Sequence, residues 1–158
     1  CKPNNPKCNL CPIKKFCYSY KNNLTNLIPI KKIRKPIKIR EAYLFWIVSN
    51  QNRVFLRRRP LTGLLPGMLE FPSSDWITKN KKTRKEILFP IKGNWKPVTG
   101  NVLHTFSHFQ LSLKIYICRD VNEKKLEGIW KKENDISDLN LPSLMKKVYK
   151  HVFSNTNH

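Results

Sequence analysis

The stretch VTGNVLHTFSHFQLSLKIYICR, residues 98–119, carries the clearest structural signal in the sequence. Hydrophobic side chains recur at every second position of its second half: Phe109, Leu111, Leu113, Ile115 and Ile117. Because successive side chains of a strand point to opposite faces, this alternation predicts a strand over 109–119 with one buried face. Residues 98–106 predict a partner strand, and a tight hairpin through Ser107 and His108 would join the two.

Segments upstream of this hairpin predict further strands. The continuous apolar run 42–48 is short enough for a strand that is buried on both faces. The turn signal Asn50-Gln51-Asn52 then predicts a hairpin with a second strand over 53–59. Residues 61–72 predict a bent loop with a strand at its end, and residues 79–88 a short helix or an exposed loop.

One amphipathic helix is predicted near the end of the chain, over residues 143–153. Pro142 marks its start, and Leu144, Val148 and Val152 share one face. Strands that outnumber helices and follow one another through turns indicate a mixed α+β domain. We expect a mostly antiparallel sheet with flanking helices.

The charge balance indicates a polyanionic partner. The chain has 158 residues, of which 31 are Lys or Arg and 10 are Asp or Glu, so the formal charge is +21. Nucleic acid is the leading candidate, because Lys and Arg displace counterions from phosphates. The alternative is a Lys-rich surface that is merely solvated. No apolar run approaches the ~20 residues of a membrane span, and no secretory signal is visible.

Four of the five cysteines fall at the start of the chain, at Cys1, Cys8, Cys11 and Cys17. Four thiolates in so short a loop suit zinc or an iron–sulfur cluster, and the spacing alone leaves both open. Disulfides are less favoured, because Cys118 stands alone in an apolar strand and nothing marks the chain as secreted. The chain begins at a cysteine rather than at methionine, so we expect it to be a fragment.

Residues 18–40 are predicted to be a basic linker. Pro29 and Pro36 exclude a continuous helix there. The linker is either a solvated tether or a strap along DNA. Its cations, together with two lysines of the cysteine loop, are the expected phosphate contacts: Lys14, Lys15, Lys31, Lys32, Arg34 and Lys35.

The cysteine spacing closely resembles the 4Fe–4S loop of the endonuclease III-type DNA glycosylases. Three further segments resemble the C-terminal domain of the MutY-type adenine DNA glycosylases: residues 57–72, the run His104–Phe109, and Trp130 with the helix after Leu141. The resemblance implies a 4Fe–4S cluster on the four cysteines, with zinc as the alternative. It also implies a division into a cluster loop (1–17), a linker (18–40), a Nudix-like domain (41–153) and a tail (154–158).

The sequence lacks the carboxylates of a Nudix hydrolase, which requires the pattern G-x5-E-x7-R-E-x2-E-E. Counting from Gly63 puts Leu69, Ile77, Thr78, Lys81 and Lys82 at the required positions. Counting from Gly67 puts Ser73, Lys81, Lys82, Lys85 and Glu86 there. Neither frame can hold a divalent ion. The Glu and Asp pair that a glycosylase needs is not visible either.

The resemblance implies that Phe106, Ser107 and His108 recognise 8-oxoguanine opposite adenine. An aromatic ring can stack on a base, and a hydroxyl can both donate to and accept from the altered base edge. We therefore expect part of an adenine DNA glycosylase of base excision repair, inactive alone. Its partner would be duplex DNA with 8-oxoguanine:adenine or guanine:adenine mispairs. We expect a monomer without membrane contact, in the bacterial cytoplasm at the nucleoid. The alternative is a stand-alone, non-catalytic DNA-binding module with a zinc or iron–sulfur clip.

Overall fold

The computed structural model describes residues 1–2, 4–28, 30, 37–78 and 86–156. It contains two compact units, residues 1–36 and 37–158, which are described separately below. Helices in the described ranges are too short or too polar to cross a membrane.

The smaller unit is built from short helical turns. It contains two 3-10 helices, η1 (Cys8–Leu10) and η2 (Lys14–Phe16), followed by one α-helical turn, α1 (Tyr18–Lys21). Successive turns are closed by backbone hydrogen bonds between residues three apart. The N–H groups of Cys11, Lys14 and Cys17 donate to the carbonyls of Cys8, Cys11 and Lys14, respectively. The expected linker therefore begins inside this unit, because residues 18–28 continue its turns.

The larger unit contains strands and helical segments in this order: β1 (Lys38–Ser49), β2 (Arg53–Arg58), β3 (Leu69–Glu70), β4 (Ile77–Thr78), β5 (Lys96–Thr105), β6 (Phe109–Val121), η3 (Glu123–Lys125), β7 (Ile129–Lys132), η4 (Glu133–Asp138) and α2 (Ser143–Thr156). The strands form one mixed sheet of order β3-β2-β1-β6-β5, in which β4 pairs with β1 and β7 with β2. The sheet and its flanking helices confirm the expected α+β class.

The centre of the sheet is the parallel pair of β1 and β6. Its register runs from Lys38 opposite Phe109 to Ser49 opposite Val121. The other strand pairs are antiparallel, so the expectation of a mostly antiparallel sheet is confirmed. Pairing with β6 also explains why β1 begins at Lys38, earlier than the expected domain start at residue 41.

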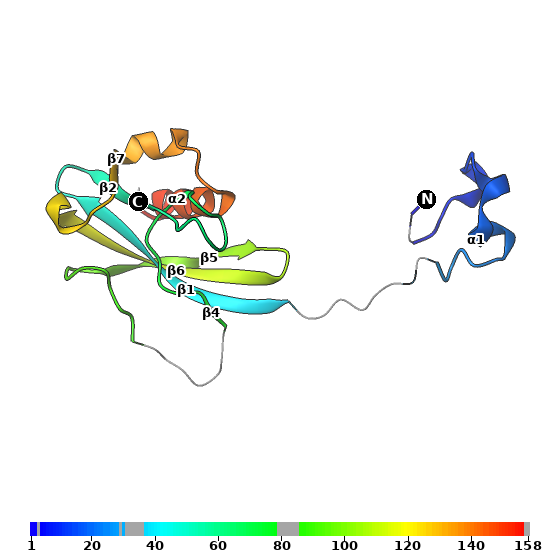
Figure 1. The fold of residues 1–158 in the computed structure, drawn as a ribbon, viewed down its shortest axis with the longest axis horizontal. Coiled ribbons are helices and arrows are strands. Elements are labelled where there is room, and N and C mark those ends of the chain that lie inside the picture. The colour runs from blue at the N-terminus through cyan, green and yellow to red at the C-terminus, as the bar shows by residue number, and fades with distance from the viewer. Residues whose placement is uncertain (3, 29, 31–36, 79–85, 157–158) are drawn as a thin grey trace. The chain divides into compact units, whose positions relative to one another are not determined.

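Both faces of the sheet are covered. Leu44 and Trp46 of β1 point into the main core, which α2 closes with Leu144, Val148 and Val152. The intervening Phe45 and Ile47 point into a second cluster on the other face, against Ile91 and Trp95. Figure 1 shows α2 and the η4 segment over one face of the sheet. Burial on both faces accounts for the uninterrupted apolar run of β1.

The helix and the alternating strand are confirmed in detail. Phe109, Leu111, Leu113 and Ile115 are buried in the main core, and Ile117 packs against it. Helix α2 extends to Thr156, beyond the predicted end at residue 153 and into the expected tail. The short strands β4 and β7 were not predicted, because two to four residues carry too little periodicity. Most of the predicted segment 79–88 lies outside the described residues.

Candidate functional site

The turn between β5 and β6 is tight and carries the predicted recognition residues. The backbone N–H of Phe106 donates to the carbonyl of Phe109 at 2.8 Å, which closes the hairpin. Phe109 is buried and Phe106 is half-buried, whereas Ser107 and His108 are exposed. The geometry is thus the predicted hairpin, and it also leaves a hydroxyl and an imidazole free to meet a ligand.

The turn packs against an aromatic cluster formed by Trp76, His104, Phe106 and Phe109. The ring centroids of Phe106 and Phe109 are 4.8 Å apart, and His104 meets Phe106 edge-on at 4.6 Å. Trp76, from the segment before β4, lies 5.7 Å from Phe106 and 6.1 Å from Phe109. The sequence prediction did not include Trp76, because nothing local marks a tryptophan as the neighbour of a hairpin some thirty residues away.

His104 occupies a setting that disfavours its charged form. Its Nδ1 is buried and has no hydrogen-bond partner among the described residues. Burial lowers the pKa of His104, and the positive charge of Lys147 on α2 lowers it further. Lys147 itself donates to the carbonyl of Leu103 at 3.3 Å. The setting therefore favours the neutral form of the ring that packs against Phe106.

Two arginines flank the aromatic cluster. The guanidinium of Arg40 lies over the ring of Phe109 at 4.4 Å, and that of Arg59 over Trp76 at 5.2 Å. Stacking uses the flat face of a guanidinium and leaves its in-plane N–H groups available. Arg40 has no ion pair within the described part of the chain. Its charge is therefore available to a phosphate beside the turn.

Glu70 on β3 is a buried carboxylate with two cationic partners. Its side chain is 1% exposed; Arg57 Nε donates to one of its oxygens at 2.9 Å, and Arg59 Nη1 pairs with the other. Such a carboxylate is committed to the fold and is not free to hold a metal ion. This network joins β2 and β3, and no local feature of the sequence predicts it.

The structure describes five of the positions at which the sequence analysis looked for hydrolase residues. The hydrolase positions that the structure describes are Leu69, Ser73, Ile77, Thr78 and Glu86. Glu86 is their only carboxylate, whereas Lys81, Lys82 and Lys85 lie outside the described residues. A Nudix metal site needs several carboxylates together, and these positions do not supply them.

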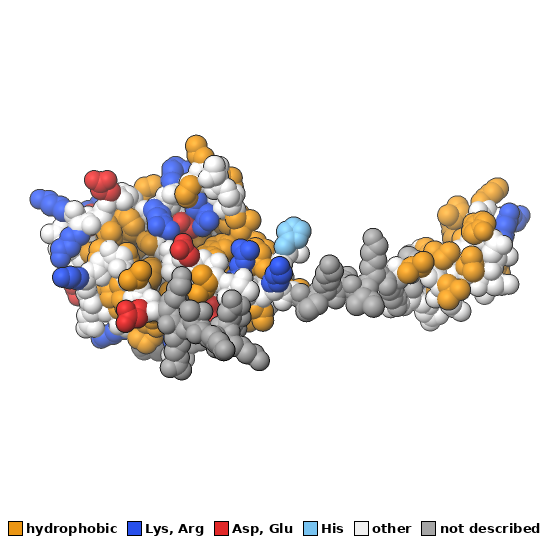
Figure 2. Space-filling view, turned by 60° about the horizontal axis from the view of Figure 1, so that its bottom comes forward, with side chains coloured by type: hydrophobic (Ala, Val, Ile, Leu, Met, Phe, Trp, Pro, Cys, Tyr) orange, Lys and Arg blue, Asp and Glu red, His pale blue; other side chains and the backbone are white. Residues whose placement is uncertain are grey.

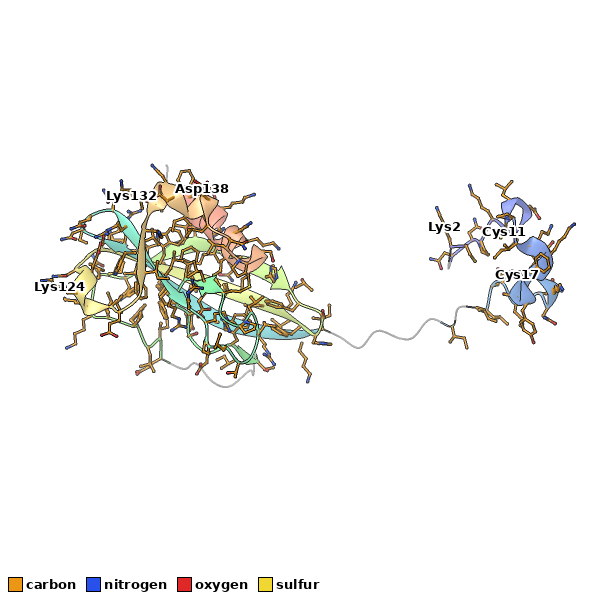
Figure 3. All side chains as sticks on the ribbon, turned by 45° about the horizontal axis from the view of Figure 1, so that its top comes forward. Lys2, Cys11, Cys17, Lys124, Lys132 and Asp138 are labelled. Atoms are coloured by element: carbon orange, nitrogen blue, oxygen red, sulfur yellow. The ribbon has the colours of Figure 1, made fainter. Side chains whose placement is uncertain are left out.

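All four N-terminal cysteines line one cavity within the smaller unit. Its volume is about 350 Å³, and its wall includes Cys1, Cys8, Cys11 and Cys17 together with Lys2, Lys7 and Lys14. The cysteines are free thiols. Figure 3 labels Cys11 and Cys17 on neighbouring turns of this unit, with Lys2 on the segment beside them. Cys118 is buried in the second cluster of the larger unit.

Zinc and an iron–sulfur cluster place different demands on the positions of four cysteines. Nowhere in the described ranges do three or more His, Cys, Asp or Glu side chains stand close enough to hold a metal ion. A tetrahedral zinc with bonds of ~2.3 Å would draw its sulfurs to about 3.8 Å of one another. A cubic cluster accepts thiolates that stand further apart. The four cysteines supply the thiolate ligands that either group requires.

The predicted phosphate contacts are described only in part. Lys15 is exposed, and Lys14 is half-buried with its Nζ 4.6 Å from the centre of the Tyr20 ring. Lys31, Lys32, Arg34 and Lys35 lie outside the described residues. On the larger unit, Figure 2 shows Lys and Arg side chains scattered over the visible face rather than gathered in one block.

A family model described as the NUDIX domain matches residues 43–151. Among curated proteins, the adenine DNA glycosylase of Buchnera aphidicola subsp. Baizongia pistaciae is 29% identical, over 100% of this chain and 46% of its own length. The human adenine DNA glycosylase is 27% identical, over 95% of this chain and 30% of its own length. The chain thus spans about half the length, or less, of the curated relatives it matches.

Solved structures share the fold of the larger unit. The C-terminal domain of mouse MUTYH, solved in complex with human PCNA, has a TM-score of 0.51 and 19% identity, covering 77% of this chain and 89% of that domain. The MutT protein of Methanosarcina mazei Go1 has a TM-score of 0.60 and 14% identity, covering 78% of this chain and 99% of that one. The expected Nudix-like fold is confirmed.

Proposed function

Because this chain belongs to the Nudix domain family but its described residues lack the hydrolase carboxylates, we propose that it is the lesion-recognition part of an adenine DNA glycosylase. The substrate of the whole enzyme would be duplex DNA in which adenine is mispaired with 8-oxoguanine or guanine. The glycosylases that align with the chain support this assignment. Such an enzyme would act on the chromosome, in the bacterial cytoplasm at the nucleoid.

The observation that carries the proposal is the exposed turn at Ser107 and His108, supported by buried and half-buried rings. 8-Oxoguanine differs from guanine by a hydrogen on N7 and an oxygen on C8. A hydroxyl can accept from the new N–H or donate to the new oxygen, whereas guanine offers neither group. The hydrogen bond that closes the hairpin fixes the backbone from which this hydroxyl projects, which lowers the cost of ordering the turn on a base.

Cations around the turn would provide the affinity that does not depend on base identity. Arg40 lies beside the turn with its in-plane donors available, and the formal charge of the chain is +21. Phosphate contacts of this kind set the register of the protein on the duplex but do not specify the base. Recognition would then divide into phosphate contacts around the turn and base contacts at Ser107 and His108.

Excision of adenine would rest with residues outside this chain. Glycosidic cleavage with an oxocarbenium-like transition state uses an acid and a stabilising carboxylate. Glu70 is held in two ion pairs. We therefore expect the chain alone to bind mispaired duplexes and to leave their adenine in place.

Cys1, Cys8, Cys11 and Cys17 would hold a 4Fe–4S cluster in this proposal. The cavity that the four cysteines share, and their spacing, which resembles that of a 4Fe–4S loop, support this assignment. Such a cluster would cross-link the loop and supply no bond-breaking chemistry. Lys2, Lys7 and Lys14, which line the same cavity, would then present positive charge to the DNA backbone.

The experiment that tests the proposal measures dissociation constants of the chain for three duplexes. These carry 8-oxoguanine:adenine, guanine:adenine and a matched guanine:cytosine pair at one position. We expect the tightest binding to the 8-oxoguanine duplex, by about threefold to tenfold over guanine:adenine, the range of one or two hydrogen bonds. Equal affinities for all three duplexes would show a general DNA-binding surface and would contradict lesion recognition.

A further inference from the structure

Trp76 connects the recognition turn to a segment distant in sequence. It precedes β4, is half-buried, and packs against the main core. Its ring is inclined by 31° to that of Phe106, with centroids 5.7 Å apart, and lies 6.1 Å from Phe109. Aromatic pairs in this range contribute about 0.5–1.5 kcal/mol beyond the area they bury.

Trp76 is in turn held from its other side. The guanidinium of Arg59 lies 5.2 Å from the ring centroid of Trp76. Arg59 is fixed by its ion pair with Glu70 and by a hydrogen bond from its Nε to the carbonyl of Leu64 at 2.8 Å. The Arg59 side chain is only 18% exposed, so its position depends on the protein rather than on solvent.

The turn has few other constraints at its tip. Within the described ranges, the side chains of Ser107 and His108 have no hydrogen-bond or ring partner. Their positions therefore follow from the backbone between Phe106 and Phe109. Because Trp76 contacts both of those rings, a shift of Trp76 would move the two ends of the turn.

We propose that Trp76, held by Arg59, is a positioning residue for the recognition turn. The inference rests on the proposed function, because it supposes that Ser107 and His108 meet the lesion base. The Nudix hydrolase pattern, counted from Gly63 or Gly67, would place its metal-binding carboxylates between residues 69 and 86. Here this part of the chain supplies Trp76, whose ring packs against Phe106 of the turn. The guanidinium of Arg59 lies over Trp76 and is itself paired with Glu70.

The test compares preference, defined as the dissociation constant for the guanine:adenine duplex divided by that for the 8-oxoguanine:adenine duplex. A role limited to stability would weaken both constants by the same factor and leave preference unchanged. A positioning role predicts that Trp76→Leu, which keeps an apolar side chain but removes the ring, lowers preference by about twofold to tenfold. Trp76→Phe, which restores a ring, should recover at least part of it.

Trp95 provides the matched control. It is half-buried and has two aromatic neighbours, Phe45 at 5.4 Å and Phe89 at 5.0 Å, but it lies in the second cluster on the other face of the sheet. Trp95→Leu should leave preference unchanged. Circular dichroism of each variant identifies any that fail to fold, and Arg59→Met then tests the same support without altering the tryptophan.

The double variant Ser107→Ala with His108→Ala separates the two proposals. If it keeps the full preference, lesion reading by the turn is wrong, and the positioning role is wrong with it. If it loses preference while folded Trp76→Leu keeps it, the positioning role alone is wrong. Loss of preference in both, with Trp95→Leu unaffected, is the result that we expect.

Discussion

The imidazole of His104 meets the ring of Phe106 edge-on, with ring centroids 4.6 Å apart and an angle of 64° between the planes. One residue supports the recognition turn and the other begins it. The contact is apolar only while the imidazole is neutral. The lowered pKa of His104 therefore ties the packing of the turn to pH.

Stability is expected to fall at acid pH through His104. Its folded-state pKa lies below the ordinary value of 6.5, so the unfolded state binds the proton more readily. The contribution of His104 to the free energy of unfolding is present above pH 6.5 and is lost as pH falls below it. Urea titrations at pH 7.5 and pH 5 should show a smaller pH dependence for His104→Gln than for the unmodified chain.

Exposed Ser107, which has no titratable group, provides the control for this measurement. Ser107→Ala should leave the pH dependence close to that of the unmodified chain. An unchanged difference between the two pH values in His104→Gln would show that His104 does not carry the effect.

The two arginines that pair with Glu70 are expected to differ in their effect on stability. The Arg59 side chain is 18% exposed and that of Arg57 is 46% exposed. Arg59→Met removes the more buried partner and should lower the free energy of unfolding by about 3 kcal/mol, because it leaves a buried carboxylate half-paired. Arg57→Met should cost about 1 kcal/mol, in the range of exposed pairs. Equal losses of unfolding free energy in the two variants, measured by urea titration, would contradict a larger contribution from Arg59.

The metal content of the chain tests the ligand set. Anaerobically purified protein should contain iron and acid-labile sulfide rather than zinc. Serine in place of Cys8 or Cys11 should lower the iron content severalfold, because a cluster held by three thiolates is labile. Cys118→Ser should leave the iron content unchanged, since Cys118 is buried in the second cluster of the larger unit. Stoichiometric zinc without iron would exclude the proposed cofactor.

Salt dependence tests the phosphate contacts that the sequence predicts. Affinity for any duplex should fall with salt, with a slope of about −0.9 in log K against log salt for each phosphate neutralised. Glutamine at Lys14 and Lys15 should make the slope shallower by up to about 2. Glutamine at Lys31, Lys32, Arg34 and Lys35 should reduce it further. The ratio of affinities for two duplexes should not change, because phosphate contacts do not specify the base.

A slope that is flat between low and moderate salt would exclude phosphate neutralisation. The matched variant Lys124→Gln should leave the slope unchanged. Lys124 is exposed in η3, which follows β6 at the opposite end of that strand from the turn. This control separates local phosphate contacts from the effect of total charge.

The sequence was sufficient for those elements whose patterns are local and long. The alternation from Phe109 to Ile117 and the helix at Leu144, Val148 and Val152 both lie where the pattern predicted them. The exposed turn at Ser107 and His108 was also predicted, because two strands flank it closely. The Nudix-like fold was predicted in another way, from the resemblance of three segments to the C-terminal domain of MutY-type adenine DNA glycosylases.

Contacts between distant segments could not be read from the sequence in the same way. Period-two alternation says which side chains share a face but not which strand lies alongside, so the parallel pairing of β1 with β6 was not specified. Two further contacts also join segments that are distant in sequence. They are the packing of Trp76 against Phe106 and the pairing of buried Glu70 with two arginines. Each contact depends on how the sheet brings these segments together.

The central claim is that the exposed turn reads the lesion. It is tested most directly by the ratio of dissociation constants for guanine:adenine and 8-oxoguanine:adenine duplexes, measured for the unmodified chain and for the double variant Ser107→Ala with His108→Ala. Both changes are at exposed positions, so the fold should be retained. The account predicts that the ratio falls from about threefold to tenfold toward one. A folded double variant that keeps the ratio of the unmodified chain would contradict it.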